Sequence, residues 1–171
     1  LVHRVCRDGI ELEATCAEAF SVSPEVQVEK WLGGWKEVQV ETVRDAMGAF
    51  AVVATLENID PLGVHTGDSI VAIPAQTLTD GELRALRDAA RAIADRLRVF
   101  GEMSVSFAFD YDSHDWRVTE ASACASRVTA IASKATGYPV AHAAARVMLG
   151  FALSEIKNPL GGDASLASEP S

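Results

Sequence analysis

Residues 63–69, which read GVHTGDS, combine the residue types that most readily hold a ligand with the backbone. Gly63 and Gly67 let backbone amides approach a ligand closely, because glycine has no Cβ atom. His65 places a ring nitrogen, which can donate or accept a hydrogen bond, between them. The alternative is a plain turn in which Asp68 makes an Asx-type hydrogen bond to the backbone. The spacing by itself favours that turn.

Other polar residues that could do chemistry have ordinary structural interpretations. Glu37 begins a predicted strand, where a carboxylate is most often solvated. Cys124 lies between two alanines with no histidine close in sequence, which favours an inert small hydrophobic residue over a nucleophile. His142 lies on an alanine-rich helix and is interpreted as structural. Residues 133–139 (SKATGYP) are typical of a helix that ends at a glycine before a proline opens the next one.

Periodicity predicts the elements that position these residues in the first half of the chain. Residues 11–20 have apolar side chains at helical spacing, which predicts a short amphipathic helix. Val26 and Val28, and then residues 38–43, alternate as strands do, and residues 51–56 form a continuous β-rich run. With a turn at residues 45–48, the sequence predicts a meander of about three strands.

The second half predicts helices around a strand hairpin. Thr79 and Glu82 form a capping-box pattern that opens a long helix over residues 80–99. Two strands follow at residues 103–109 and 116–119, joined by a polar turn at residues 110–115. Two alanine-rich helices are then predicted at residues 126–135 and 140–148. The element order predicts an α+β fold, with a mostly antiparallel sheet flanked by helices. We expect a domain over residues 1–158 and a flexible tail or linker over residues 159–171.

The composition fits one globular domain of 171 residues. A net charge of −9 argues against a nucleic-acid surface and against an anionic membrane surface. No apolar run approaches the roughly 18 residues that a membrane span needs. Three scattered cysteines argue against a disulfide framework or zinc site and favour a reducing compartment. Because the sequence starts at Leu1 without a methionine, we expect a piece of a longer protein.

Residues 34–37 (GWKE), 63–69 and 133–139 together resemble the large subunit of carbamoyl-phosphate synthetase. The resemblance is to the first of its two ATP-grasp halves and extends from about residue 11 to residue 158. It implies the large subdomain of an ATP-grasp fold. The second ATP-grasp subdomain, which would complete the nucleotide site, is expected to lie outside this sequence.

The resemblance also implies which residues bind the nucleotide. Glu37 matches the family's acceptor for the ribose hydroxyls. The remaining implied contacts to ATP are those beside the base and those of the glycine-rich turn: Lys30, Leu32, Gly63, Val64 and His65.

A magnesium site is implied at Glu120, with Ser106 and Ser122 beside it. Mg²⁺, or Mn²⁺ in its place, takes hard oxygen ligands near octahedral geometry. The family has Gln and Asn where this chain has Ser106 and Ser122, and Arg where it has Cys124. Arg127 matches a second family arginine and is implied as the catalytic residue facing the phosphoryl or bicarbonate group. These replacements predict weak or absent activity, because phosphoryl transfer depends on positioning and charge neutralisation.

The implied activity is phosphorylation of bicarbonate by MgATP to carboxyphosphate, on the way to carbamoyl phosphate. The implied partners are ATP, bicarbonate, the missing ATP-grasp subdomain and a glutaminase subunit, but no nucleic acid and no membrane. The implied setting is pyrimidine or arginine biosynthesis, in the cytoplasm or, for some members of the family, the mitochondrial matrix. The alternatives are a non-catalytic ATP-grasp-like scaffold or regulatory module and another ATP-grasp carboxylate ligase, such as a biotin-dependent carboxylase domain. An interaction protein unrelated to ATP is the remaining alternative.

Overall fold

The computed structural model describes residues 3–64 and 68–166. The chain forms two compact units, residues 1–32 and residues 33–171, and each is described by itself. In the first unit, helix α1 (Gly9–Phe20) begins after Asp8, whose side chain accepts a hydrogen bond from the backbone N–H of Glu11 at 2.8 Å. That bond satisfies one of the N–H groups that a helix start leaves unpaired.

No strand forms between α1 and the first strand of the sheet, so the strand predicted around Val26 and Val28 was wrong. The predicted three-stranded meander is therefore a two-stranded hairpin. The side chain of Val28 is 61% exposed, which shows that the alternating valines bury no common face. Alternation describes a strand only where a neighbouring strand is present to accept its hydrogen bonds.

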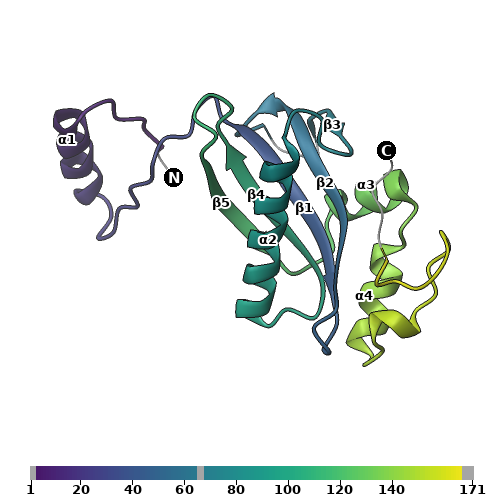
Figure 1. Ribbon diagram of the computed structural model, residues 1–171. Coiled ribbons are helices and arrows are strands. Elements are labelled where there is room, and N and C mark those ends of the chain that lie inside the picture. Colours follow the sequence, from purple (N-terminus) through teal and green to yellow (C-terminus); the bar gives the residue numbers. More distant parts are fainter. Residues whose placement is uncertain (1–2, 65–67, 167–171) are drawn as a thin grey trace. The chain divides into compact units, whose positions relative to one another are not determined.

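The second unit is built on a five-stranded antiparallel sheet with the strand order β3-β2-β1-β4-β5 (Figure 1). The central strand β1 pairs with β2 on one side and β4 on the other, and is buried along most of its length. The bounds are β1 (Lys36–Arg44), β2 (Phe50–Pro61), β3 (Val71–Ala72), β4 (Gly101–Phe109) and β5 (Trp116–Ser122). Strands β2 and β5 continue beyond the ends that the sequence predicted.

The predicted turn at residues 45–48 joins β1 to β2. Asp45 organises it, because its Oδ1 accepts hydrogen bonds from the backbone N–H groups of Met47 and Ala49, both at 2.9 Å. Gly48 has φ +91°, a backbone conformation that suits glycine. The other carboxylate oxygen of Asp45 accepts from the N–H of Leu153 at 2.8 Å, so the same side chain also attaches the C-terminal part of the domain.

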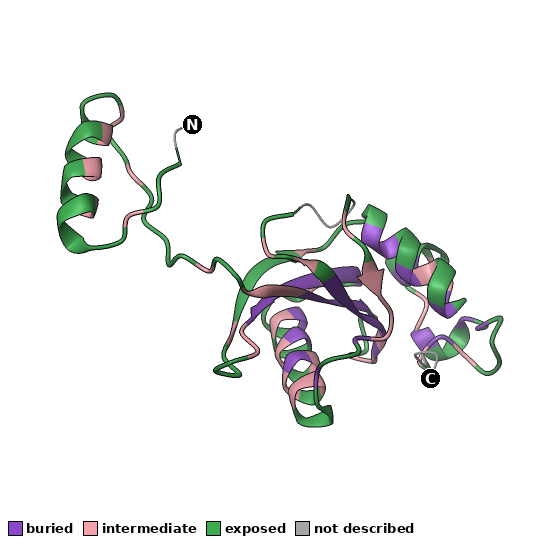
Figure 2. Ribbon diagram, turned by 90° about the horizontal axis from the view of Figure 1, so that it is seen from above, coloured by how far each residue is buried: buried purple, intermediate pink, exposed green. Residues whose placement is uncertain are grey.

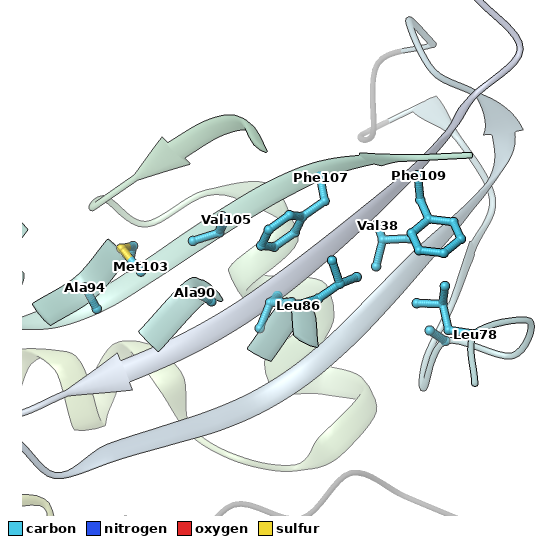
Figure 3. Close-up of a cluster of buried hydrophobic side chains, with 11 residues drawn as sticks. Val38, Leu78, Leu86, Ala90, Ala94, Met103, Val105, Phe107 and Phe109 are labelled. Atoms are coloured by element: carbon cyan, nitrogen blue, oxygen red, sulfur yellow. The ribbon is translucent and has the colours of Figure 1, made fainter. Parts of the chain in front are cut away.

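Helix α2 (Asp80–Leu97) covers one face of the sheet (Figure 1). The predicted capping box is confirmed: Thr79 N donates to Glu82 Oε2 at 2.7 Å, and Glu82 N donates to Thr79 Oγ1 at 3.4 Å. The buried side of the helix packs on alternate residues of β1 and β4, which form the largest apolar cluster (Figure 3). Its labelled members are Val38, Leu78, Leu86, Ala90, Ala94, Met103, Val105, Phe107 and Phe109.

Helices α3 (Arg127–Thr136) and α4 (Val140–Met148) lie at the other face, and their sheet-facing sides are buried (Figure 2). Gly137 ends α3 with φ +75°, as the sequence predicted for a glycine C-terminal to a helix. The 3₁₀ turn Leu153–Glu155 follows α4. Ala164 is 1% exposed, and its carbonyl oxygen accepts from Tyr138 Oη at 2.6 Å. Residues up to Leu166 thus make specific contacts with the domain.

None of the helices in the described ranges is long and apolar enough to cross a membrane.

Candidate functional site

A row of polar side chains crosses strands β1, β4 and β5 on the sheet face opposite α2. The register pairs Gln39 with Ser106 and Glu41 with Ser104, and then pairs Ser106 with Glu120 and Ser104 with Ser122. Side chains that oppose each other across antiparallel strands point to the same face. We call this set, together with Glu37, the polar face: Glu37, Gln39, Glu41, Ser104, Ser106, Glu120 and Ser122.

The three residues expected to hold a metal are neighbours on the polar face. Ser106 is directly opposite Glu120, and Ser122 is two residues along the strand from Glu120. Ser106 is 7% exposed, and its hydroxyl accepts a hydrogen bond from Gln39 Nε2 at 2.9 Å. Glu120 is exposed to solvent. The arrangement offers one carboxylate and two hydroxyls, all of them oxygen donors of the kind that Mg²⁺ accepts.

This donor set is weaker than a typical magnesium site in proteins. Within residues 3–64 and 68–166, no group of three or more His, Cys, Asp or Glu side chains could hold a metal ion. The hydroxyl of Ser122 lies 3.1 Å from the exposed thiol of Cys124. Ser122, like Ser106, therefore already has a hydrogen-bonding neighbour that competes with a metal ion for its oxygen. Glu120 would have to hold the ion with neutral ligands, water and substrate phosphates.

Glu37 lies where the polar face meets strand β2, and it is half-buried. Its Oε2 accepts from Asn58 Nδ2 at 2.8 Å, and its Oε1 accepts from Gln39 Nε2 at 3.1 Å. Asn58, which is 2% exposed, was not predicted as a site residue. The sequence did place Asn58 just after a β-rich run, and a buried amide side chain there needs a hydrogen-bond partner. The carboxylate of Glu37 is therefore held in a fixed orientation.

Gly63 and Val64 follow the end of β2, close to the start of β1. Lys36 pairs with Pro61, and the N–H of Val64 donates to the carbonyl of Pro61 at 3.2 Å. Gly63 has φ +104°, and nothing would lie within 4 Å of a Cβ atom there. Gly63 thus presents open backbone beyond the paired ends of β1 and β2. The expected nucleotide contact His65 lies outside the described residues.

Downstream in the same segment, Asp60 and Ser69 hold the loop ends together. Ser69 Oγ donates to Asp60 Oδ2 at 2.8 Å. The N–H of Ile59 also donates to the carbonyl of Ile70 at 2.9 Å. The loop between these residues is therefore closed by two contacts at its base.

Lys30 and Leu32, expected beside the base, lie in the 1–32 unit, whereas Glu37 lies in the 33–171 unit. Their grouping around one ligand stays a prediction. Arg127 is the first residue of α3 and is exposed. The same helix contacts the polar face through Thr129, whose Oγ1 donates to Glu41 Oε2 at 3.4 Å. Arg127 is thus two residues from a direct contact with the polar face, and its role toward a phosphate stays a prediction.

Glu41 and Glu57 are buried carboxyl groups on opposite faces of the sheet, and their pKa values are shifted in opposite directions. Burial raises the pKa of Glu41 to about 7, and the charge of Glu102 contributes to the rise. Burial by itself would also raise the pKa of Glu57 on β2. Hydrogen bonds from Thr77, Tyr111 and Gln76 outweigh burial and hold that pKa below its ordinary value. Glu57 is therefore a fully engaged anion, whereas Glu41 is poised to hold a proton.

Comparison with protein families matches residues 2–156 to the model described as "Carbamoyl-phosphate synthase L chain, ATP binding domain". The arginine-specific large chain of carbamoyl phosphate synthase from Eremothecium gossypii is 48% identical over 164 residues, which cover 96% of this chain and 15% of that protein. The carbamoyl phosphate synthase large chain of Pyrococcus furiosus is 44% identical over 169 residues, covering 98% of this chain and 16% of that protein. The chain thus spans less than one fifth of the length of these relatives.

Solved structures with the same fold have much lower sequence identity. The biotin carboxylase domain of a single-chain bacterial carboxylase covers 98% of this chain at a TM-score of 0.75 and 16% identity, with 36% of that chain matched. Biotin carboxylase from Campylobacter jejuni, in complex with β-γ-ATP, covers 84% of this chain at a TM-score of 0.65 and 16% identity, with 32% of that chain matched. At such identities the likeness shows the fold alone. The expected α+β fold of an ATP-grasp large subdomain is confirmed.

Proposed function

Because the chain belongs to the family of carbamoyl-phosphate synthase large-chain ATP-binding domains, we propose that its polar face is one wall of a MgATP site that activates bicarbonate. The observation that carries the proposal is the placement of Glu120, Ser106 and Ser122 side by side on that face. In the proposed reaction a bicarbonate oxygen bonds to the γ-phosphorus of ATP while the bond to the ADP oxygen breaks, which gives carboxyphosphate. Ammonia from a glutaminase subunit would then lead on to carbamoyl phosphate.

The proposal assigns each residue of the site a role. Glu37, oriented by Asn58 and Gln39, would accept the ribose hydroxyls. The backbone of the Gly63–Val64 turn and the side chain of His65 would contact the nucleotide, with Lys30 and Leu32 beside the base. Glu120, Ser106 and Ser122 would hold magnesium. Arg127 would face the phosphoryl or bicarbonate group as the catalytic residue.

Mg²⁺, when bound, neutralises charge on the transferring phosphoryl group. The chain's own contribution to that step is small compared with the family pattern. Ser106 replaces an amide ligand and is already hydrogen-bonded to Gln39, and Cys124 replaces an arginine that could hold a phosphate with two hydrogen bonds. Each lost contact is expected to cost about two to three orders of magnitude in rate. We therefore propose that this chain is weakly active or inactive.

A second candidate is a non-catalytic ATP-grasp-like scaffold or regulatory module that keeps the fold. The observation in its favour is the donor set itself. In the described part of the chain no cluster of three acidic, His or Cys side chains is present for a metal, while the apolar core and helix caps are intact. The family match makes a carbamoyl-phosphate synthase module a better proposal than another carboxylate ligase.

Calorimetric titration of the chain with ATP, with and without Mg²⁺, tests the first proposal. Magnesium-dependent binding that is lost in Glu120→Ala and kept in Asp88→Ala would support it. Asp88 is an exposed carboxylate on α2, so that control removes a similar charge on the opposite side of the sheet. Binding that is unchanged in Glu120→Ala would refute the metal assignment.

Restoring the family residues separates the two candidates. Suppose that the wild-type chain binds no ATP. If the only defect is the replaced ligands, the triple variant Ser106→Gln, Ser122→Asn and Cys124→Arg should bind ATP. Such recovery would favour the scaffold. The absence of binding in both proteins would indicate instead that the second ATP-grasp subdomain is needed to complete the site.

The whole protein is proposed to include the second ATP-grasp subdomain and to work with a glutaminase subunit. Four of the relatives are named as arginine-specific, and two of those as mitochondrial. A place in arginine biosynthesis, in the mitochondrial matrix or the cytoplasm, is the corresponding proposal for this protein. Fractionation of the source cells and a bicarbonate-dependent ATPase assay on the full polypeptide would test it.

A further inference from the structure

Two acidic side chains are buried on the sheet face that packs against helices α3 and α4. Glu41 on β1 is 0% exposed, and Glu102 on β4 is 9% exposed. Glu41 is opposite Ser104 and Val43 is opposite Glu102, so the two glutamates lie diagonally across adjacent strands on one face. Diagonal neighbours in an antiparallel pair are roughly 7–8 Å apart at Cα, within reach of long side chains. We call Glu41 and Glu102 the acid pair.

Each member of the acid pair has a carboxylate oxygen without a hydrogen-bond partner. Among the described residues, neither Glu41 Oε1 nor Glu102 Oε2 is hydrogen-bonded, and no Lys, Arg or His forms an ion pair with either glutamate. Burying one unpaired carboxylate is costly, and burying two close together is costlier. The free-energy cost of burying the pair is lower if one of the two carboxyls is protonated and therefore neutral.

The groups that face Glu41 come from several elements. Strand β2 presents Ala54 opposite it, and strand β4 presents Ser104 and Glu102. Helix α3 presents Thr129. Helix α4 also packs on β1 and β4, and its Arg146 has its guanidinium over the ring of Phe151, 4.1 Å from the ring centroid. Glu102 is therefore the charged neighbour that acts on Glu41, and it has the same sign.

Thr129 connects the acid pair to the start of α3. Its hydroxyl accepts a hydrogen bond from Ser126 N at 3.2 Å, which is part of the capping box of α3, and donates to Glu41 Oε2 at 3.4 Å. One hydroxyl therefore serves both the helix cap and the buried carboxyl. A change of charge at Glu41 acts directly on the end of α3 that carries Arg127.

We propose that Glu41, buried beside Glu102, keeps a proton near neutral pH, and that this proton stabilises the packing of α3 on the sheet. A carboxyl that is buried beside a second carboxyl is more easily protonated, because burial and the like charge both disfavour its ionised form. The inference concerns the fold of the domain and does not depend on nucleotide binding.

The direction of the pH effect follows from the difference between the folded and unfolded chains. Burial and Glu102 raise the pKa of Glu41 from 4.5 to about 7, and burial also raises that of Glu102. The folded chain binds more protons than the unfolded chain between those values, so stability is highest at the acid end and is lost as the pH rises through about 7. With one such group, the folding equilibrium constant falls roughly 70-fold between about pH 5 and pH 8.

Urea denaturation of the chain between these pH values tests the proposal. The wild type and the matched control Asp88→Asn, which removes an exposed carboxylate of α2, should both show the fall. Glu41→Gln, which is neutral at every pH, should lose most of it. A wild-type folding constant that does not fall, or a fall that persists in Glu41→Gln, would overturn the proposal.

A titration of the side-chain carboxyl carbons by NMR keeps the test valid if Glu41→Gln does not fold. In the wild type, one ¹³C-labelled glutamate should titrate near pH 7, and Glu102→Gln should lower that midpoint. The proposal would be overturned if every glutamate titrated below about pH 5.5. It would also be overturned if Glu102→Gln left the midpoint unchanged.

Discussion

Replacing Glu57 with glutamine is expected to detach the segment before α2 from the sheet. Glu57 lies on β2 and is 3% exposed. Its Oε2 accepts from the backbone N–H groups of Gln76 and Thr77, at 2.8 and 3.0 Å. Its Oε1 accepts from Tyr111 Oη at 2.8 Å and from Thr77 Oγ1. One carboxylate thus joins β2, the loop that leads into α2, and the residues after β4.

The size of the effect follows from the number of bonds. Glutamine keeps one acceptor oxygen but turns an N–H₂ group toward donors, so two of the four hydrogen bonds are lost. A hydrogen bond to a charged group contributes about 1.5–3 kcal/mol, which gives an expected loss of at least about 3 kcal/mol. For a domain of this size that loss corresponds to a fall in Tm of roughly 6–12 °C.

Thermal unfolding followed by circular dichroism at neutral pH measures this loss. Tyr111→Phe removes a single donor to this charged group and should cost about 1.5–3 kcal/mol. The double variant should lose less than the sum of the two single variants, because both remove the same bond. Hydrogen bonds hold the pKa of Glu57 below 4.5 against the effect of burial, so its stabilisation is present above that pH and is lost as the pH falls.

Glu57→Gln should therefore also reduce the sensitivity of the domain to acid. A loss of less than about 1 kcal/mol would refute this account of Glu57, since it would be smaller than one hydrogen bond to a charged group. Unchanged acid sensitivity would refute it independently.

Three further substitutions, with a fourth as a control, test the packing that supports the site. Gly137→Ala should lower the unfolding temperature by an amount equivalent to about 1–2 kcal/mol, because Gly137 has φ +75° and a Cβ atom would lie 2.9 Å from a leucine methyl group. Gly81→Ala is the control, because Gly81 lies in α2, has no positive φ and leaves room for a Cβ atom. It should be neutral or slightly stabilising, and a larger loss in Gly81→Ala than in Gly137→Ala would contradict this expectation. Tyr138→Phe should cost about 1–2 kcal/mol in urea denaturation, because a buried carbonyl loses its donor. Phe107→Ala should cost about 3–5 kcal/mol by the same measurement, and a cost below about 2 would mean that the site collapses without a cavity.

Features set by neighbours in the sequence were predicted correctly. The capping box at Thr79 and Glu82 fixes the start of α2, and the chain folds there as the pattern predicted. The turn after Asp45 and the glycine that ends α3 are also local, since each depends on hydrogen bonds and backbone angles within a few residues. The predicted strand near Val28 was wrong for the complementary reason. Its alternation is local, but the partner strand that it needed is absent.

The sequence by itself determined which residue types alternate along each strand, and through the family resemblance which of them belong to a candidate site. Only the tertiary structure decided which of them meet. Gln39 reaches Ser106 across 67 positions, and Asn58 reaches Glu37 across 21. The acid pair likewise depends on the register of β1 against β4. A shift of that register by one residue would turn these side chains to the other face, and the sum of many core contacts fixes it.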